Sequence, residues 1–200
     1  LMDENGIELE GNSVDGRLCI KFPWPSMART IWGNHQRYKE TYFSAYDNMY
    51  FTGDGALRDK NGHYRITGRV DDVIIVSGHN LGTAPIEDAI NEHPAVSESA
   101  IVGYPHDIKG SALYGYVTLK NSDHSSEALK TEINQLISKQ IGPIAKLNKI
   151  QFTNGLPKTR SGKIMRRILR KIASKDTSNL GDISTLLNPE VVEMIMKNSQ

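Results

Sequence analysis

A lysine on a glycine-bearing basic segment is the first candidate for chemistry in this sequence. Lys163 follows Gly162 in the run 155–164, Gly-Leu-Pro-Lys-Thr-Arg-Ser-Gly-Lys-Ile. This run is not a phosphate-binding P-loop, because six residues separate its glycines where a P-loop has four, and Ile164 stands where Ser or Thr would bind magnesium. What remains is an ammonium group on a flexible loop just ahead of a predicted helix, where it can reach an anion across a gap.

Two simpler interpretations of this basic segment stay open. From Lys158 to Lys171 it has seven basic residues and no acidic one. A solvated basic helix would place Ile164, Ile168 and Ile172 toward a core. A nucleic-acid patch is the other possibility, although no aromatic residues interleave with the basic ones for base stacking.

Two further segments combine carboxylates with an arginine. Asp54 stands between Gly53 and Gly55, which predicts a loop carboxylate at a strand end that could accept hydrogen bonds from a ribose diol, although a turn aspartate is commoner. Arg69 follows Gly68 and can reach a sugar or phosphate, while Asp71 can serve as a hinge between domains. A surface ion pair of Arg69 with an aspartate is the simpler local interpretation.

The histidines predict neither a zinc site nor a catalytic triad. The six are scattered, without a pair three or four residues apart. His93 lies on the apolar face of a predicted helix, where we expect a structural role.

Composition bounds the function classes. The chain has 200 residues, 38% hydrophobic and 24% charged, which excludes collagen-like and disordered classes. Its 24 basic and 23 acidic residues leave a net charge of +1, so attraction of the whole chain to nucleic acid or membrane is not supported.

The single cysteine, Cys19, cannot form an internal disulfide and fits a reducing, intracellular setting. No signal peptide is visible at 1–5, and Leu1 suggests a piece of a longer chain.

The first part of the chain, to about residue 70, is predicted to be rich in β-structure. We expect a turn at Val14–Arg17, a strand at Leu18–Lys21 and a short helix at Arg29–Tyr38. Asp59–Gly62 predicts the turn of a hairpin that pairs Gly55–Arg58 with His63–Ile66.

Strands alternate with helices beyond that point. Expected strands are 73–76, 99–102, 114–119 and 149–153. Expected helices start at Thr83, at Ser125 or Ser126, at Gly162 and near Val191. In the first of these helices, Glu87 and Asp88 would complement the helix dipole. A polar loop is expected at 77–82. The pattern predicts an α/β (α+β) fold, in which a small C-terminal domain has a short central sheet flanked by helices and follows a β-rich segment. The predicted boundary is Arg69–Asp72.

Several of these segments, in this order, carry a family resemblance. They are Tyr50–Asp54, Ile66–Ile74, Val76–His79, Leu81–Thr83, Leu156–Arg167 and the closing Asp176–Asp182. Together they resemble the C-terminal third of AMP-forming acyl-CoA ligases of the adenylate-forming superfamily, in the branch that activates acetate and propionate. The resemblance covers essentially the whole chain, and its two main motifs lie more than 80 residues apart.

The resemblance implies roles in a first, adenylate-forming half-reaction. Lys163 would bridge the attacking carboxylate and the α-phosphate of ATP, which is electrostatic catalysis and positioning. Asp54 would bind the ribose hydroxyls beside Arg69, and Asn80 would face the nucleotide phosphate. Asp71 would be the hinge about which the C-terminal domain rotates between half-reactions.

The resemblance implies further roles in the second half-reaction, in which the thiolate of CoA attacks the acyl carbon. Ser77, Gly78 and His79 would line the pantetheine tunnel, and Ser138 would lie near the nucleotide of CoA. A turn formed by Asn91, His93 and Val96 would hold Mg²⁺, partly through main-chain carbonyls.

Three positions depart from the branch pattern. Asn80 and Ser138 stand where arginines contacting phosphates are usual, and Ile75 stands where an asparagine is usual. Each missing arginine contact would be worth roughly 1.5–3 kcal/mol, so weaker binding of ATP or CoA, or a divergent paralogue, is possible.

The resulting expectation assigns residues 1–70 to the end of a large N-terminal adenylation domain, 71–72 to the hinge and 72–200 to the C-terminal cap domain. It implies acetate, ATP, Mg²⁺ and CoA as substrates and cofactors, and a cytoplasmic location. Expected partners are the N-terminal domain and, at Lys163, a lysine acetyltransferase and deacetylase, with neither nucleic acid nor membrane.

Two alternative functions stay open. Within the same enzyme class, the alternative is activation of propionate; in a different functional class, the alternative is a non-catalytic or nucleic-acid-binding module. This segment alone is expected not to catalyse adenylation, because it has neither a phosphate loop nor an acyl pocket.

Overall fold

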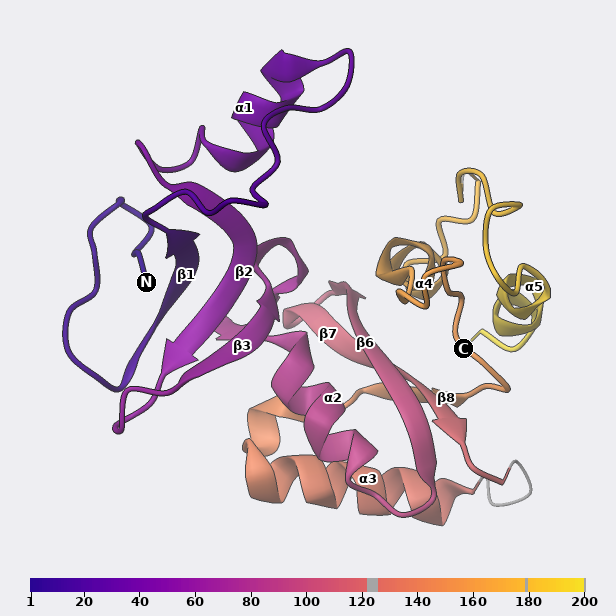
Figure 1. The fold of residues 1–200 in the computed structure, drawn as a ribbon. Coiled ribbons are helices and arrows are strands. Elements are labelled where there is room, and N and C mark those ends of the chain that lie inside the picture. The colour runs from indigo at the N-terminus through magenta and orange to yellow at the C-terminus, as the bar shows by residue number, and fades with distance from the viewer. Residues whose placement is uncertain (122–125, 179, 200) are drawn as a thin grey trace. The chain divides into compact units, whose positions relative to one another are not determined.

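The computed structural model describes residues 1–121, 126–178 and 180–199. Contacts divide the chain into two compact units, Leu1–Asp72 and Val73–Gln200. Each unit has its own sheet, and both can be followed in Figure 1. In the part of the chain that the structure describes, no helix is long and apolar enough to cross a bilayer.

The first unit is built on a three-stranded antiparallel sheet in the order β1-β2-β3. Its elements are β1 (Val14–Ile20), α1 (His35–Tyr42), β2 (Tyr50–Arg58), β3 (Tyr64–Arg69) and a 3₁₀ turn, η1 (Val70–Asp72). The predicted β2–β3 hairpin is confirmed: Asp59 Oδ1 accepts the N–H groups of Asn61 and His63 at 2.8 and 2.9 Å, and Gly62 takes a φ of +85°.

Two predictions for this unit are wrong. Val14–Arg17 is not a turn, because these residues already pair with β2. The short helix begins at His35 rather than Arg29, since the side chain of Asn34 accepts the N–H of Arg37 at 3.0 Å and so caps the helix there.

The second unit has a five-stranded sheet covered by helices on both faces. Its elements are β4 (Ile74–Val76), β5 (His79–Leu81), α2 (Thr83–Asn91), β6 (Val96–His106), β7 (Gly110–Leu119), α3 (Glu127–Gln140), η3 (Pro143–Ala145), β8 (Lys149–Phe152), α4 (Arg166–Ala173) and α5 (Glu190–Lys197). β7 pairs antiparallel with β6, parallel with β8 and, through Gly110, with Val76 of β4. The predicted sheet flanked by helices is confirmed.

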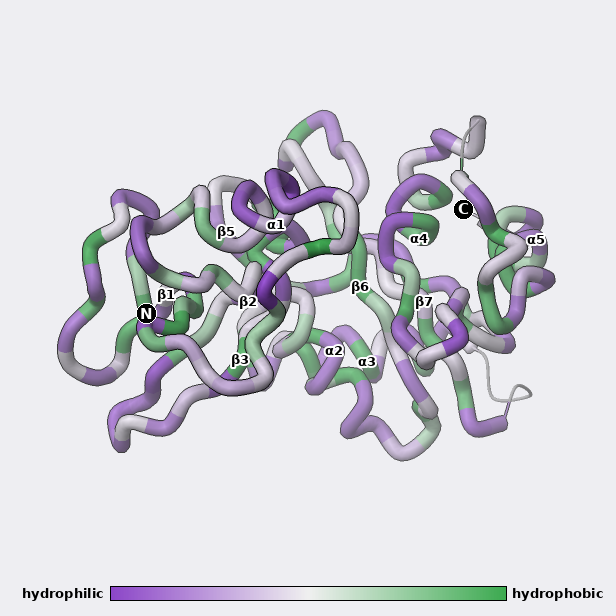
Figure 2. The backbone as a smooth tube through the Cα atoms, turned by 45° about the horizontal axis from the view of Figure 1, so that its top comes forward, coloured by the Kyte–Doolittle hydropathy of each residue, from purple (hydrophilic) through white to green (hydrophobic). Residues whose placement is uncertain are grey.

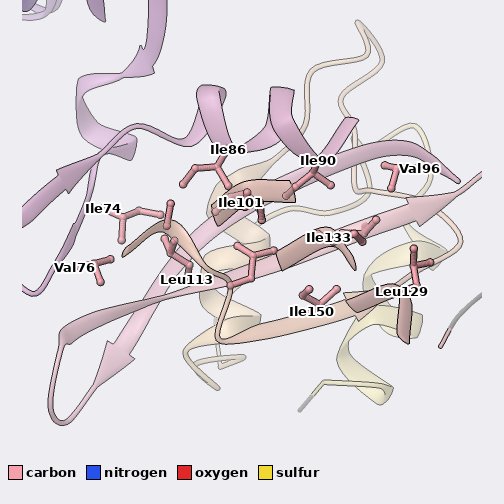
Figure 3. Packing of buried hydrophobic residues seen from close by; sticks show 14 residues of the cluster. Ile74, Val76, Ile86, Ile90, Val96, Ile101, Leu113, Leu129, Ile133 and Ile150 are labelled. Atoms are coloured by element: carbon pink, nitrogen blue, oxygen red, sulfur yellow. The ribbon is translucent and has the colours of Figure 1, made fainter. Parts of the chain in front are cut away.

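Alternation along β6 and β7 creates two cores. Ile101, Leu113 and Val117 face the layer of α2 and α3, whereas Tyr114 and Tyr116 face α4 and α5. Figure 3 shows the first cluster, with Ile86 and Ile90 of α2 above the sheet residues. Figure 2 shows hydrophilic and hydrophobic residues alternating along α4 and α5, as expected for helices with one buried face. Ile168 and Ile172 are buried as predicted, and Ile164 packs against them.

Several local predictions for the second unit need correction. Strand 73–76 is not buried throughout: Ile74 and Val76 point inward, while Ile75 is 58% exposed. The segment 77–82 is not an open loop, because Val76 pairs with His79 and only Ser77 and Gly78, both with positive φ, form the turn. α2 starts at Thr83 as expected, with Gly82 at its N-cap, but Glu87 and Asp88 lie beyond the first turn and do not complement the helix dipole there.

The remaining corrections concern where elements begin and end. β6 and β7 are longer than the expected strands 99–102 and 114–119. α2 ends at Asn91, so His93 lies beyond the helix. Ser126 caps α3 by accepting the N–H of Leu129 at 3.1 Å, and Ser125 lies outside the described residues. α4 begins at Arg166 rather than at Gly162, because residues 160–162 form a turn ahead of the helix.

Candidate functional site

The first unit brings together Asp54, Arg69 and Asp71. Asp54 and Arg69 are cross-strand partners in β2 and β3, next to a bulge that shifts the register between Gly55 and Ala56. Arg69 Nη1 lies 3.7 Å from Asp54 Oδ1, and Arg69 Nε donates to Asp71 Oδ1 at 3.1 Å. The expectation that Asp54 sits on a loop at a strand end is wrong, because it lies inside β2.

A threonine and a glycine shape this cluster. Thr52 accepts the Asp54 N–H on its hydroxyl at 3.1 Å, and its carbonyl accepts a hydrogen bond from Arg69 Nη1 at 3.1 Å. Gly53 has a φ of +80°, and a Cβ there would lie 2.5–2.7 Å from the Arg69 guanidinium. The guanidinium therefore lies directly over the Gly53 backbone. Both Asp54 and Arg69 keep exposed side-chain surface, so the cluster could offer hydroxyl-binding acceptors and an anion-binding donor together.

The second unit presents Lys163 on a tight, hydrogen-bonded turn. Thr159 N donates to the Lys163 carbonyl at 2.9 Å, Lys163 N donates to Thr159 Oγ1 at 3.1 Å, and Gly162 takes a φ of +83°. Lys163 is exposed, and within the described residues its ammonium makes no hydrogen bond or ion pair. This side chain is thus free to meet an anion.

Both ends of this turn are fixed by ion pairs to acidic residues elsewhere in the unit. Lys158 Nζ lies 2.6 Å from Glu98 Oε2 on β6. Arg166 contacts the Glu87 carboxylate on α2 through Nη2 at 2.5 Å and Nε at 3.2 Å. Two of the seven basic residues are therefore structural, which argues against a uniformly solvated basic face.

Residues 186–188, just before α5, also form hydrogen bonds with the segment that holds Lys163. The Asn188 side chain donates to the Leu156 carbonyl at 2.9 Å and accepts the Lys158 N–H at 3.1 Å. Leu187 N donates to the Lys158 carbonyl at 2.8 Å, and Thr159 pairs with Leu186. The segment before α5 therefore lies beside the lysine turn and is joined to it by an isolated β-bridge and these hydrogen bonds.

The residues expected to line a thiol tunnel form the β4–β5 turn. Ser77 and Gly78 occupy its two central positions, with φ values of +49° and +80°. The side chain of His79 folds back, with Nδ1 3.2 Å from the Ser77 carbonyl oxygen. Asn80 pairs with Ile75 across the hairpin, and nothing described lies within 4 Å of a Cβ built at Gly78. The turn is open to solvent on the side where a substituent would stand.

Asn91, His93 and Val96 lie around the α2–β6 turn. Asn91 Oδ1 accepts the Ser99 hydroxyl at 2.9 Å, His93 Nδ1 accepts the Ala95 N–H at 3.2 Å, and the His93 carbonyl accepts the Val96 N–H at 2.9 Å. These side chains do not form the set of oxygen ligands that Mg²⁺ prefers. Across the described ranges, no cluster of three His, Cys, Asp or Glu side chains could hold a metal. Ser138 lies apart from this turn in sequence, half-buried on α3.

Sequence reasoning missed the pairing of Glu87, Glu98 and Asn188 with the lysine turn, and it gave Gly53 no role beyond flanking Asp54. Glu87 was expected to complement a helix dipole, yet it is buried against Arg166. The signal that could have indicated these carboxylates was the run Lys158–Lys171, which has seven basic residues and no acidic one. When part of such a run is buried, it needs carboxylates from elsewhere in the chain.

The chain is similar in sequence to known proteins. Residues 85–163 match the family model described as AMP-binding enzyme C-terminal domain. The chain is 56% identical over its whole length to the acetyl-coenzyme A synthetase of Methylorubrum populi, of which it covers 31%. The chain therefore spans about a third of the length of the curated relatives that it matches.

Solved structures share the fold. An acetoacetyl-CoA synthetase from Streptomyces lividans superposes with a TM-score of 0.82 at 22% identity, covering 98% of this chain and 29% of that one. An anthranilate CoA ligase in complex with anthranoyl-AMP superposes with a TM-score of 0.78 at 27% identity, covering 90% of this chain and 34% of that one.

Proposed function

We propose that this chain, whose residues 85–163 match the model of the AMP-binding enzyme C-terminal domain, is part of an acetate-activating, AMP-forming CoA ligase. In the proposed first step, a carboxylate oxygen of acetate attacks the α-phosphorus of ATP. The bond to the bridging oxygen breaks, and pyrophosphate leaves. In the second step, the CoA thiolate attacks the acyl carbon and AMP leaves with the bonding electrons, so that acetyl-CoA forms.

The exposed, unpaired ammonium of Lys163 carries the proposal. Negative charge grows on the oxygens around the α-phosphorus as acetate attacks, and a preorganised cation there stabilises the transition state more than the ground state. The turn that holds Lys163 is fixed by hydrogen bonds and flanking ion pairs, so little reorganisation is needed when the charge develops.

Asp54 and Arg69 are proposed to bind the ribose of ATP. The carboxylate accepts hydrogen bonds from ribose hydroxyls, and Arg69 holds that carboxylate in place from β3. Asp71, in the 3₁₀ turn at the end of the first unit, is the proposed hinge, with residues 1–70 as the end of the adenylation domain and 72–200 as the cap domain. Asn80 is proposed to face the nucleotide phosphate, where an amide offers a neutral donor.

The open β4–β5 turn of Ser77, Gly78 and His79 is proposed to line the path of the CoA thiol, with Ser138 near the CoA nucleotide. Gly78 lacks a side chain at the tip, which leaves room for a narrow pantetheine chain. Mg²⁺ near Asn91, His93 and Val96 would depend on main-chain carbonyls, and no step above depends on it.

Cellular aspects of the proposal follow from the same lysine and the same substrates. ATP, CoA and acetate are metabolites of the cytoplasm, where we place the enzyme. The exposure of Lys163 makes it accessible to an acetyltransferase and a deacetylase, and acetylation would remove the positive charge that the first step needs.

The test separates the two half-reactions in the full-length enzyme. We expect Lys163→Ala to abolish acetate-dependent pyrophosphate release while leaving formation of acetyl-CoA from supplied acetyl-adenylate near the wild-type rate. Lys197→Ala, an exposed lysine on α5, is the control and should change neither rate. Equal loss of both half-reactions in Lys163→Ala would contradict the assigned role. Replacing acetate with propionate in the same assay decides between the two acyl substrates.

A further inference from the structure

Glu87 is a buried carboxylate with partners from two other elements. It lies on α2, with 8% of its surface exposed. Its Oε1 accepts the N–H of Ile101 on β6 at 2.9 Å, and its two oxygens accept Nε and Nη2 of Arg166 at 3.2 and 2.5 Å. The carboxylate therefore ties together α2, the central sheet and the beginning of α4.

The beginning of α4 needs this negative charge. Arg166 and Arg167 are its first two residues, its first turn has no acidic residue, and Met165 provides no side-chain cap. Cations near a helix N-terminus are repelled by the helix dipole. Glu87 supplies the missing anion from another helix and so stabilises an arrangement that the local sequence opposes.

The form of this ion pair favours a geometric role. A buried ion pair adds little stability compared with apolar residues of similar size, but it demands one relative orientation of its partners. A two-pronged contact between a planar guanidinium and a carboxylate fixes direction as well as distance. Glu87 thus fixes the direction and distance of the Arg166 side chain at the start of α4. Arg166 lies three residues after Lys163.

The Lys163 turn has little freedom between its fixed ends. Met165 N donates to the Pro157 carbonyl at 2.8 Å, and Lys158 pairs with Ile164 across the turn. A shift of Arg166 would therefore be passed on to the backbone of Lys163.

We propose that Glu87 is a positioning residue that, through Arg166, orients Lys163 for adenylate formation. The inference rests on the proposed function, because it assigns Lys163 to that step. A positioning role predicts that the rate of the first half-reaction depends on Glu87 more than the rate of the second, since thioester formation does not use Lys163.

The test uses Glu87→Gln in the full-length enzyme. The amide keeps the shape of the side chain but loses its charge and one acceptor oxygen for Arg166. We expect the rate constant kcat of acetate-dependent pyrophosphate release to fall about 100-fold, the effect of a misplacement of about 1 Å. The KM for ATP and the formation of acetyl-CoA from supplied acetyl-adenylate should stay within about threefold of wild type. A parallel fall of both half-reactions, or a change in neither, would overturn the proposal.

A second variant keeps the test decisive if Glu87→Gln does not fold. Arg166→Lys retains a cation opposite Glu87 but replaces the two-pronged contact with a single ammonium. We expect the same separation of half-reactions, with a smaller fall of about tenfold in adenylation. Wild-type adenylation by Arg166→Lys would contradict a role that depends on orientation.

Two controls separate this inference from its premise. Glu127→Gln makes the same chemical change in an exposed ion pair with Lys130 on α3 and should alter neither rate. If Lys163→Ala abolishes adenylation while Glu87→Gln and Arg166→Lys do not, only the positioning role fails. If Lys163→Ala leaves adenylation intact, the proposed function fails first.

Discussion

At the residue scale, Gly53 fixes the position of a charged side chain by having no side chain of its own. The guanidinium of Arg69 occupies the space that a Cβ at residue 53 would fill. In Gly53→Ala, Arg69 must swing away from Asp54 and from the Thr52 carbonyl. Because a flexible side chain can move, we expect the free energy of unfolding to fall only by the strain of the positive φ, about 1–2 kcal/mol.

The affinity for ATP should change much more in Gly53→Ala. Loss of one charge-assisted contact of Arg69 predicts about a tenfold or larger rise in the dissociation constant for ATP, measured by calorimetry on the full-length enzyme. Gly11→Ala is the matched control, since Gly11 also has a positive φ, of +71°, but nothing within 4 Å of its Cβ. Equal ATP affinity in both variants would show that Arg69 does not contribute to nucleotide binding.

The buried phenol of Tyr116 predicts an alkaline limit to stability. Its hydroxyl donates to the Leu169 carbonyl at 3.1 Å, and burial raises its pKa far above the ordinary value of 10.0. The folded state therefore keeps this proton when the unfolded chain loses it. Above about pH 10, the free energy of unfolding should fall by about 1.4 kcal/mol per pH unit from this group alone.

Denaturant unfolding of the wild type and of Tyr116→Phe between pH 8 and pH 11 measures this contribution. The variant should be less stable than the wild type at pH 8 by about 1 kcal/mol, since it lacks the hydrogen bond. The difference should shrink and then reverse as the pH rises through 10. A constant difference over this range would contradict the burial of the phenol.

Residue types alone predict exposed groups for the candidate site but do not reveal the carboxylates that pair with its basic segment. Lys163, Asp54, Arg69 and Asp71 stand out because glycine and charge occur together around them. Glu87 and Glu98 do not, because their partners lie 79 and 60 residues away in the sequence. Pairing over such distances is decided by how the elements pack, which local patterns do not specify.

At the scale of elements, a buried amide adds hydrogen bonds to the apolar packing that holds α5. Gln151 of β8 accepts the Tyr114 hydroxyl at 2.8 Å and donates to the Ile195 carbonyl of α5 at 3.0 Å. Gln151→Leu keeps a similar volume but removes both hydrogen bonds. We expect a loss of about 1–3 kcal/mol in the free energy of unfolding, because buried polar groups lose a partner.

Hydrogen exchange can locate that loss. Amides of α5 should exchange faster in Gln151→Leu, whereas those of α2 and α3, which pack on the opposite face of the sheet, should not. Gln135→Leu, an exposed site on α3, makes the same change without burial and should leave α5 protected. Unchanged exchange in α5 of Gln151→Leu would contradict its docking role.

Element types were more predictable than element ends. The helix expected to start at Ser125 or Ser126 was predicted correctly as α3, and its residues Leu129, Ile133 and Ile137 recur at helical spacing and are all buried. The start of α4 was misplaced at Gly162, because the N–H groups of Gly162 and Lys163 donate to Thr159 and hold that segment as a turn. Similarly, the β4–β5 hairpin was not predicted, because one of the two residues with positive φ that join these strands is serine, and serine is not typical of such a turn.

At the scale of the whole molecule, the division at Asp72 and Val73 makes Asp71 the place to test rotation between the units. Asp71 lies in a 3₁₀ turn, whose φ is close to the value that proline fixes. Asp71→Pro should therefore hold the chain in one local conformation. If the proposed rotation alternates two active arrangements, one half-reaction should continue near the wild-type rate while the other falls by about 100-fold or more.

Asp71→Ala is the necessary control for that experiment. It removes the contact of Asp71 with Arg69 but leaves the backbone free to rotate, so any loss caused by the ion pair alone appears in both variants. Wild-type rates of both half-reactions in Asp71→Pro would place the hinge elsewhere. A selective loss in Asp71→Pro, absent from Asp71→Ala, would instead mean that Lys163 must leave before the thiol can enter, since a fixed cap cannot serve both steps.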